Sequence, residues 1–440
     1  MRLQNIYDRT PVWVQNLMCS IKGAMIKRRR YGKQFYEELQ KLEAGEYDQR
    51  EELYAFLLQA KELPAYQGLI GEVTKENVYD VIQGLPVIDK AYVKSHIDDL
   101  TNHACVEPQF MMRTSGTTGG GLVFPYTVRM ENKHWGIWWR YRRALGIDLD
   151  TWCGWFGGKR MIDPNNRKPP FWRVNTPGRQ VMFSSMHLTS ETVSWYHKEI
   201  DKRHLTWIHG YPSHIAKFAG LAIDCGLPPL MEVQFVTTGA ENLLGNQMTL
   251  MQQMFPNSII RQHYGLMEGV ANFSQNKEGE WIVDDDFAYV EFLPVSEERQ
   301  NVCKIIGTSF SNPAFPLIRY DTGDIATVEI MSGGTVKVLS IDGRSSNVIK
   351  GPDGFEINEA RLSIVLHDFN NIVEAQFVQH SLTDVDLLIV KNTKYGDNDE
   401  SLLRSNISDC FDNRMHVNIK YVDAIPKTKS GKLKLVVTDL

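Results

Sequence analysis

Between about residues 110 and 340, short runs of β-type sequence alternate with segments of helical periodicity. The runs at residues 233–238 and 304–308 are two examples. Strands that alternate with helices along a chain are typical of an α/β domain, in which helices cover a largely parallel sheet. This alternation therefore predicts an α/β fold for the largest part of the chain.

One of the helical segments is predicted to begin at Ser190, whose side chain can cap the first turn, where Glu191 also lies. The period of 3.6 residues then places four side chains on one face, namely Val193, Tyr196, His197 and Ile200. Because the other three side chains of this face are bulky and largely apolar, we expect His197 to lie at the edge of the core rather than to bind a ligand.

The two ends of the chain differ from this central part. The stretch before about residue 100 is rich in helical sequence and poor in glycine. The last hundred residues contain strand-like runs at 374–378 and 385–390 and a lysine-rich tail at 426–434. We predict a large N-terminal α/β domain over residues 1–341, and a separate small C-terminal α+β unit over residues 342–440.

The charge and cysteine content exclude several classes of protein. The formal net charge of -5 argues against a nucleic-acid-binding protein that works by bulk positive charge. The six cysteines include no CxxC pair, so free thiols in a reducing compartment are expected. Because the sequence has neither an uncharged apolar run of about 18 residues nor a signal-peptide pattern, we expect a cytoplasmic protein.

The first 40 residues are locally basic, with eight Lys or Arg residues against three acidic ones, and they include an apolar stretch at residues 12–14. Two interpretations stay open for this segment. It is either an amphipathic segment that makes a peripheral contact with an anionic membrane, or a solvated helix packed on the main domain.

The sequence RTSGTTGGG at residues 113–121 is the most informative motif. Glycines and small hydroxylated residues in one run expose backbone N–H groups and hydroxyls together, which suits a phosphate group. A Walker A loop is excluded, because no Gly-Lys-Ser/Thr follows at the required spacing. The alternative is a flexible connection that binds nothing.

Two further motifs place an acid close to a glycine. In QHYGLMEG at residues 262–269, Tyr264 offers a flat surface for a base and Glu268 a carboxylate for Mg²⁺, the alternative being an ordinary turn. In PLIRYDTGDI at residues 316–325, Asp324 could accept hydrogen bonds from a ribose diol. The alternative there is a hairpin turn in which Asp324 caps its own backbone.

Together with DGRSSNVIKG at residues 342–351 and KTKSGK at residues 427–432, these motifs resemble the adenylate-forming enzymes in order and spacing. That superfamily comprises acyl-CoA synthetases, luciferases and the adenylation domains of peptide synthetases. The segments YGLME and RYDTGD are most similar to the phenylacetate-CoA ligase branch. The N-terminal segments TPVWVQNL and RRRYG are similar to relatives of that branch associated with capsular-polysaccharide synthesis. The resemblance covers essentially the whole chain.

The resemblance implies a two-step reaction. A carboxylate attacks the α-phosphate of MgATP to give an acyl-adenylate and pyrophosphate, and a nucleophile such as the thiol of coenzyme A then displaces AMP. As catalytic residues, Lys432 would bridge the attacking carboxylate and the α-phosphate, and Glu268 would bind Mg²⁺. The residues that bind ATP or AMP would be Thr114, Ser115, Gly116, Thr117, Thr118, Gly119, Gly239, Ala240, Glu241, His263, Tyr264, Gly265, Asp324 and Arg344.

The resemblance further implies that the small C-terminal domain moves between two orientations, one for each half-reaction. The hinge would lie two residues after the motif arginine, at Ser346, a position where Asp or Lys is common. The phosphate loop ends in Gly120 and Gly121 rather than in Pro-Lys, so a familiar charge is absent there. Because relatives in this branch are often dimers, a homodimer is expected.

The pocket for the acid is expected between the phosphate loop and Tyr264. Residues 152–173 mix aromatic side chains with five cations, among them Lys159 and Arg160, which suggests a polar or anionic acid such as a uronic acid. The alternative is a solvated loop beside core tryptophans. Tyr211, within HGYPS at residues 209–213, either lines this pocket or stands at a plain helix entry.

Three functions therefore stay open. The first is an acid-thiol ligase that uses coenzyme A. The second is a ligase that joins the adenylated acid to an amine in surface-polysaccharide synthesis. The third is a non-catalytic nucleotide-binding protein, which the joint presence of Glu268, Asp324 and Lys432 disfavours.

Overall fold

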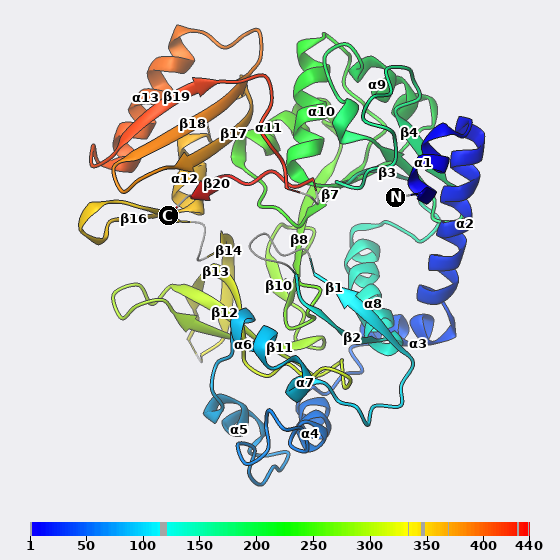
Figure 1. Ribbon diagram of the computed structural model, residues 1–440, viewed down its shortest axis with the longest axis vertical. Coiled ribbons are helices and arrows are strands. Elements are labelled where there is room, and N and C mark those ends of the chain that lie inside the picture. The colour runs from blue at the N-terminus through cyan, green and yellow to red at the C-terminus, as the bar shows by residue number, and fades with distance from the viewer. Residues whose placement is uncertain are drawn as a thin grey trace. The chain divides into compact units, whose positions relative to one another are not determined.

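The computed structural model of the chain describes residues 2–114, 121–332, 334–344, 348–367, 369–428, 431–438 and 440. The chain forms two compact units, each built from segments that are distant in the sequence. The first unit comprises Met1–Met25, Asp150–Gln262 and Asp342–Leu440, and the second comprises Ile26–Leu149 and His263–Ile341. Figure 1 shows the helices and strands of both. The division into domains at residue 341 stays a prediction.

The first unit contains most strands of an eight-stranded sheet, whose order is β10-β9-β8-β7-β6-β3-β5-β4. Five of its strands, with the start of a sixth, lie in this unit: β3 (Cys153–Phe156), β4 (Trp172–Asn175), β5 (Gln180–Phe183), β6 (Trp207–Gly210), β7 (Phe235–Gly239) and β8 (Ile259–Gly265). Strands β5, β3, β6 and β7 pair in parallel, and β4 is an antiparallel edge strand. The chain between the strands forms α9 (Val193–Lys202), α10 (Pro212–Asp224) and α11 (Gly245–Met254). This confirms the predicted alternation of strands and helices.

Helix α9 confirms the predicted face but not the predicted start. Val193, Tyr196, His197 and Ile200 are all buried, and His197 Nε2 lies 2.8 Å from the carbonyl oxygen of Pro228, as expected of a histidine at the edge of the core. The prediction of a start at Ser190 was wrong. The residues before Val193 form a separate turn, in which the Thr189 N–H donates to the Thr192 hydroxyl, so the helix begins three residues later.

The C-terminal part of the first unit is a four-stranded sheet with two helices. The strands β17 (Ile372–Gln379) and β18 (Asp384–Lys391) contain the two runs that the sequence predicted as strands. The sheet order is β19-β18-β17-β20, with β19 (His416–Tyr421) at one edge and β20 (Val436–Thr438) at the other. Its core is closed by α12 (Glu359–Val365) and α13 (Asp397–Phe411), and a small hairpin of β15 (Val348–Lys350) and β16 (Glu356–Asn358) precedes it.

The N-terminal segment forms α1 (Arg2–Arg9) and α2 (Val12–Arg30). The part of α2 in the first unit packs against β4: Asn16 Oδ1 accepts the Val174 N–H at 3.0 Å, and the buried Gln15 accepts the Arg173 Nε–H at 2.5 Å. The interpretation as a helix packed on the main domain is thus confirmed for this face of α2. None of the helices in the described part of the chain is long and apolar enough to span a membrane.

The second unit begins with helices, as the sequence predicted: α3 (Lys33–Ala44), α4 (Gln49–Ala60), α5 (Val78–Gly84), α6 (Lys90–Ser95) and α7 (Ile97–Leu100). The antiparallel pair β1 (Gln109–Arg113) and β2 (Val123–Thr127) then leads into the long helix α8 (Val128–Leu145). The end of β8 pairs with β9 (Asn272–Gln275), which pairs with β10 (Trp281–Val283). The chain continues as a four-stranded antiparallel sheet of β11 (Ala288–Pro294), β12 (Val302–Ser309), β13 (Tyr320–Ile330) and β14 (Val336–Arg344).

Candidate functional site

In the first unit, the segment after β7 is held in a strained conformation. Gly239 ends the strand, and Ala240, which follows it, has a φ of 68°. A left-handed backbone costs a residue with a Cβ roughly 1–2 kcal/mol, and such strain is retained mainly where the surrounding structure or a ligand requires it. These are two of the residues predicted to bind the nucleotide.

Glu241 connects this segment to two other parts of the first unit. Its Oε2 accepts the Ser213 N–H at 3.3 Å, in the first turn of α10, and its Oε1 accepts the Leu433 N–H at 2.9 Å, in the C-terminal tail. Burial raises the pKa of the Glu241 carboxyl, whereas these backbone donors favour its charged form. Glu241 therefore ties the tail that carries Lys432 to the strained segment.

Gly431 and Lys432, which we call the lysine loop, are hydrogen-bonded to Thr428, and they approach a second backbone closely. The Gly431 N–H donates to Thr428 O at 2.8 Å, and the Lys432 N–H donates to the Thr428 hydroxyl at 3.0 Å. Gly431 has a φ of 84°, and a Cβ placed on it would lie 2.6 Å from Gly158 Cα. Only glycine fits both conditions, so this residue allows the lysine loop to lie against the loop that contains Lys159.

Tyr211 lies beside Lys432. The lysine Nζ is 5.9 Å from the centre of the tyrosine ring, near the outer limit of a cation–π contact. Tyr211 directly precedes α10, and its N–H donates to Phe156 O at 3.0 Å. The interpretation as a helix entry is therefore confirmed. A role of Tyr211 in a substrate pocket stays a prediction.

The predicted basic segment is divided between solvent and structural contacts. Lys159 is exposed, as are Arg167 and Lys168. Arg160 Nη2 lies 2.8 Å from Asp8 Oδ2 in α1. Arg173 is buried and holds α2, so its charge has a structural use. Four of the five cations are thus exposed, and a role of Lys159 and Arg160 in a substrate pocket stays a prediction.

Arg344 stands at the end of β14 and is exposed. The preceding Gly343 has a φ of 88°, and a Cβ placed on it would lie 2.7 Å from Glu359 Oε2 and 3.0 Å from Asn242 Nδ2. The positive φ and the close neighbours both favour glycine at position 343, near the end of β14. The predicted hinge, Ser346, lies outside the described residues.

In the second unit, Tyr264 and Asp324 are in direct contact. The Tyr264 hydroxyl donates to Asp324 Oδ2 at 2.8 Å, across 60 positions of sequence. Asp324 lies within β13 and is buried, and it is Asp321 that caps the local backbone by accepting the Gly323 N–H at 2.8 Å. Asp324 therefore stands in a strand rather than in a hairpin turn, and its role in binding a ribose stays a prediction.

Glu268 follows β8 in a turn closed by a hydrogen bond from the Gly269 N–H to Leu266 O, and it is buried. Among the described residues, no group of three or more His, Cys, Asp or Glu side chains could hold a metal ion. A single carboxylate is still enough for Mg²⁺, which usually binds through one or two carboxylates, water and substrate phosphates. The backbone at Glu268 thus forms the turn that was the alternative interpretation of this motif. The binding of Mg²⁺ by Glu268 stays a prediction.

Thr114 ends the described part of the phosphate motif. Its hydroxyl accepts the Leu122 N–H at 3.0 Å and its own N–H donates to Leu122 O at 3.0 Å, which closes the base of the loop. The predicted phosphate-binding residues Ser115, Gly116, Thr117, Thr118 and Gly119 lie outside the described residues. Gly265, which ends β8, is exposed.

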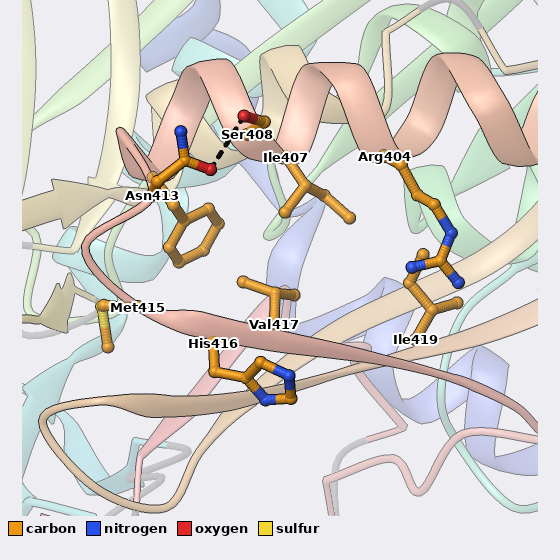
Figure 2. A pocket seen from close by; sticks show the side chains of 9 residues that line it. Arg404, Ile407, Ser408, Asn413, Met415, His416, Val417 and Ile419 are labelled. Atoms are coloured by element: carbon orange, nitrogen blue, oxygen red, sulfur yellow. Dashed lines mark hydrogen bonds between the residues drawn. The ribbon is translucent and has the colours of Figure 1, made fainter.

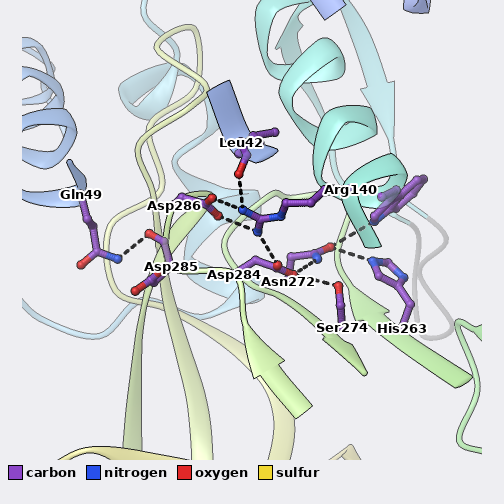
Figure 3. Close-up of polar contacts among 10 residues, drawn as sticks. Leu42, Gln49, Arg140, His263, Asn272, Ser274, Asp284, Asp285 and Asp286 are labelled. Atoms are coloured by element: carbon purple, nitrogen blue, oxygen red, sulfur yellow. Dashed lines mark hydrogen bonds and ion pairs between the residues drawn. The ribbon is translucent and has the colours of Figure 1, made fainter. Parts of the chain in front are cut away.

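His263 is held by a buried polar network that the sequence did not predict (Figure 3). Asn272 Oδ1 accepts the Trp138 Nε1–H at 3.1 Å and lies 2.9 Å from His263 Nε2, while its Nδ2 donates to Asp284 Oδ2 at 2.6 Å. Arg140 in turn binds Asp284 at 2.7 Å and also Asp286. Burial lowers the pKa of His263 to about 3. The signal in the sequence was the run of three aspartates at residues 284–286.

A second cluster missed from the sequence lies between α10 and the C-terminal sheet of the first unit. Glu374 of β17, buried, binds Lys427 at 2.9 Å and Lys217 of α10 at 3.4 Å. Burial alone would raise the pKa of Glu374, but the charges of Lys427 and Lys217 outweigh it and hold the pKa below its usual value. The cluster therefore stabilises the contact of the C-terminal sheet with α10.

Figure 2 shows a pocket between α13 and β19. It is lined by Arg404, Ile407, Ser408, Phe411, Asn413, Met415, His416, Val417 and Ile419. Two of the lining side chains are joined by a hydrogen bond, in which the Ser408 hydroxyl donates to Asn413 Oδ1 at 3.0 Å. None of the described residues that were predicted to bind ATP or the acid is among those that line this pocket.

The chain is similar to proteins of known name and structure. The family model described as the CapK C-terminal domain matches residues 349–439. Protein CapK of Staphylococcus aureus is 25% identical over 458 residues, which cover 100% of both chains. A solved structure of 2-hydroxyisobutyryl-CoA ligase in the postadenylation state with 2-HIB-AMP is 14% identical, covers 89% of each chain and has a TM-score of 0.64.

The anthranilate CoA ligase AuaEII, solved in complex with anthranoyl-AMP, is 15% identical and has a TM-score of 0.51, over 73% of this chain and 65% of that one. At these identities the likeness to solved structures is one of fold. It confirms the fold class predicted from the sequence.

Proposed function

On the premise that this chain is a full-length distant homologue of CapK with the mixed α/β fold of the adenylate-forming ligases, a large N-terminal domain and a small C-terminal domain, we propose that it is an AMP-forming acid ligase. It activates a carboxylic acid with MgATP and transfers the acyl group to the thiol of coenzyme A. The observation that carries the proposal is the attachment of the lysine loop to Glu241 through the Leu433 N–H. That contact places Lys432 beside Tyr211 and next to a strained segment predicted to bind the nucleotide.

In the first step a carboxylate oxygen of the acid bonds to the α-phosphorus of ATP, and the bond from that phosphorus to the bridging oxygen breaks to release pyrophosphate. Two anions approach each other in this step, so positive charge has to stand where the negative charge develops. We assign this role to Lys432. When bound, Mg²⁺ neutralises phosphate charge, and Glu268 would hold it.

In the second step the sulfur of coenzyme A bonds to the acyl carbon, and the bond from that carbon to the AMP oxygen breaks. The thiol loses its proton and AMP leaves. The 2-hydroxyisobutyryl-CoA ligase of the comparison was also solved with 2-HIB-AMP and CoA together.

The nucleotide is assigned to the remaining residues of the motifs. Thr114 with Ser115–Gly119 would bind the phosphates, Gly239, Ala240 and Glu241 would border the adenine with Gly265 and the residues before it, and Arg344 would lie near the ribose. Tyr264 and Asp324 support this assignment most directly. The hydrogen bond between the Tyr264 hydroxyl and the buried carboxylate of Asp324 brings an aromatic ring for the base next to a carboxylate for the ribose hydroxyls.

A second candidate acceptor is an amine, which would give an amide from the same adenylate. It is favoured by the full-length homology to CapK, because the sequence resembles relatives associated with capsular-polysaccharide synthesis. The exposed Lys159, whose loop contacts the lysine loop, suits a polar or anionic acid such as a uronic acid.

The test is acid-dependent exchange of radioactive pyrophosphate into ATP across a panel of aryl, hydroxy and uronic acids. Mass analysis of the product then follows, with coenzyme A or amines supplied. A thioester supports transfer to coenzyme A, and an amide supports the second acceptor. If no acid promotes exchange although ATP binds, the proposal is wrong and a non-catalytic nucleotide-binding protein is indicated.

A further inference from the structure

Helix α2 exposes a continuous apolar face. Trp13, Leu17, Ile21 and Met25 are 69%, 51%, 53% and 69% exposed, and they recur every four residues. Side chains at this spacing lie on one side of a helix. With Met18 they make up what we call the outer face of α2. An exposed apolar face of this extent marks an interaction surface rather than ordinary protein surface.

The opposite side of α2 is fixed to the first unit, so the helix cannot roll to bury its outer face. Asn16 accepts the Val174 N–H, and the Ser20 hydroxyl donates to Val174 O at 3.3 Å. Gly23 lies so close to Asn175 that a Cβ on it would be 1.9 Å from the amide oxygen. These contacts hold the helix by its polar side and leave the apolar side directed away from the unit.

The charged residues of α2 are all of one sign. Helix α2 contains five Lys and Arg residues and no Asp or Glu. Arg29 and Arg30 are bound to Glu131, whereas Lys22 and Arg28 are exposed. The one acid of α1, Asp8, is paired with Arg160. Lys22 and Arg28 thus have no ion-pair partner among the described residues, and they leave net positive charge on α2 beside the outer face.

From this combination we infer that the outer face of α2 docks on an anionic membrane surface. Membrane-surface helices insert a Trp- and Leu-bearing apolar side at the headgroup level, and nearby Lys and Arg side chains attract anionic lipids. A second copy of the chain would cover the apolar side chains equally well. It would, however, bring a second uncompensated cationic helix against the first.

The test uses the full chain and sedimentation with vesicles of phosphatidylcholine alone or with about 30% phosphatidylglycerol. We expect binding to the anionic vesicles at least about tenfold tighter than to the neutral ones, and weaker binding as salt is raised. The double variant Trp13→Gln/Ile21→Gln should lose about tenfold in affinity for anionic vesicles, and Lys22→Gln/Arg28→Gln should lose the preference for them.

Trp195→Gln is the matched control, because Trp195 is a partly exposed tryptophan (46%) on α9 of the same unit. It should bind vesicles as the unchanged chain does, and circular dichroism checks that all variants are folded. Equal vesicle binding by Trp13→Gln/Ile21→Gln and the control contradicts the inference. A dimer in light scattering that this double variant abolishes, with no vesicle binding by the unchanged chain, identifies a second copy as the occupant instead.

Discussion

The backbone N–H of Leu433 donates a hydrogen bond to Glu241 Oε1 at 2.9 Å. These residues are 192 positions apart, and each is adjacent to a residue with a predicted role. Leu433 follows Lys432, and Glu241 follows the strained Ala240. Because a carboxylate with two backbone donors is strongly oriented, the contact fixes the end of the lysine loop relative to the segment after β7.

Replacing Lys432 by alanine should reduce acid-dependent pyrophosphate exchange by about 10²–10³-fold or more while leaving ATP binding nearly unchanged. A charge that acts mainly on the transition state affects turnover more than binding. Exchange assays and calorimetric titration with ATP measure the two effects separately.

Lys434→Ala is the control for Lys432, since Lys434 stands two positions further along the same tail. It should retain exchange, because its recorded contact uses the backbone oxygen, which accepts from Gln376. If Lys432→Ala exchanges pyrophosphate as fast as this control, the catalytic role is refuted.

Replacing Asp324 by alanine should weaken ATP binding by about 10- to 100-fold, because hydrogen bonds to a charged group contribute about 1.5–3 kcal/mol. Tyr264→Phe keeps the ring but removes the hydroxyl that binds Asp324, so it should weaken ATP binding by a smaller factor. Titration of each variant with ATP gives both numbers.

Asp321→Ala is the matched control in the same strand, since Asp321 caps Gly323 rather than facing Tyr264. Its affinity for ATP should equal that of the unchanged chain. An unaltered affinity in Asp324→Ala would count against the ribose assignment.

Glu374→Gln should lower the free energy of unfolding by about 3 kcal/mol at pH 7, because it leaves two largely buried lysines without their common partner. The pKa of Glu374 is lowered in the folded chain, so its stabilisation is present above the usual pKa of about 4.3 and is lost as the pH falls through the lower folded value. The difference between the two proteins in urea unfolding should therefore shrink as the pH falls below about 4.

A surface pair supplies the control for Glu374. Glu280 binds Lys337 at 3.1 Å, with both side chains about half exposed, so Glu280→Gln should change the unfolding free energy much less. A difference between Glu374→Gln and the unchanged chain that stays constant from pH 7 to pH 3 would contradict the assigned ion pairs.

His263 should be neutral with its proton on Nε2. The indole N–H of Trp138 is only a donor, so the atom of Asn272 that it meets is the oxygen, and the same oxygen faces His263 Nε2. Because burial lowers the pKa of His263 to about 3, the ring should stay neutral through the physiological range. Its Nδ1 then carries no proton and can only accept a hydrogen bond.

Nitrogen NMR of histidine-labelled protein measures this tautomer, and the spectrum of His263→Gln assigns the signal. A proton found on Nδ1, or a ring that protonates near pH 6.5, would contradict the network.

Local patterns predicted the elements well because they depend on neighbours in sequence. The buried face of α9 follows from the helical period, and β12, β17 and β18 follow from their β-type runs. The start of α9 was missed because Thr189 and Thr192 bind each other and form a turn that competes with a cap at Ser190. A cap by Ser190 and a turn closed by Thr192 are both compatible with the local sequence, so the sequence alone does not decide between them.

The site was predictable where a motif carries its residues and not where distant segments meet. Tyr264 and Asp324 were each named from their own motif, but their mutual hydrogen bond was not. The sequence made no prediction for the ion pairs of Glu374 with Lys217 and Lys427, because these residues come from three distant segments. Arg160 was predicted for the substrate pocket, but its ion pair with Asp8, 152 positions away, was not predicted. Such pairings depend on tertiary contacts that no spacing rule contains.

The absence of a side chain at Gly431 determines how closely the lysine loop can approach Gly158. Any larger residue there would meet the backbone of Gly158, which cannot rotate aside as a side chain can, and would also have to adopt an unfavourable φ. The loop would then stand off from its neighbour, and Lys432 would be displaced with it. The lack of a Cβ at Gly431 thus limits the distance between the C-terminal segment that contains Lys432 and the loop that contains Gly158.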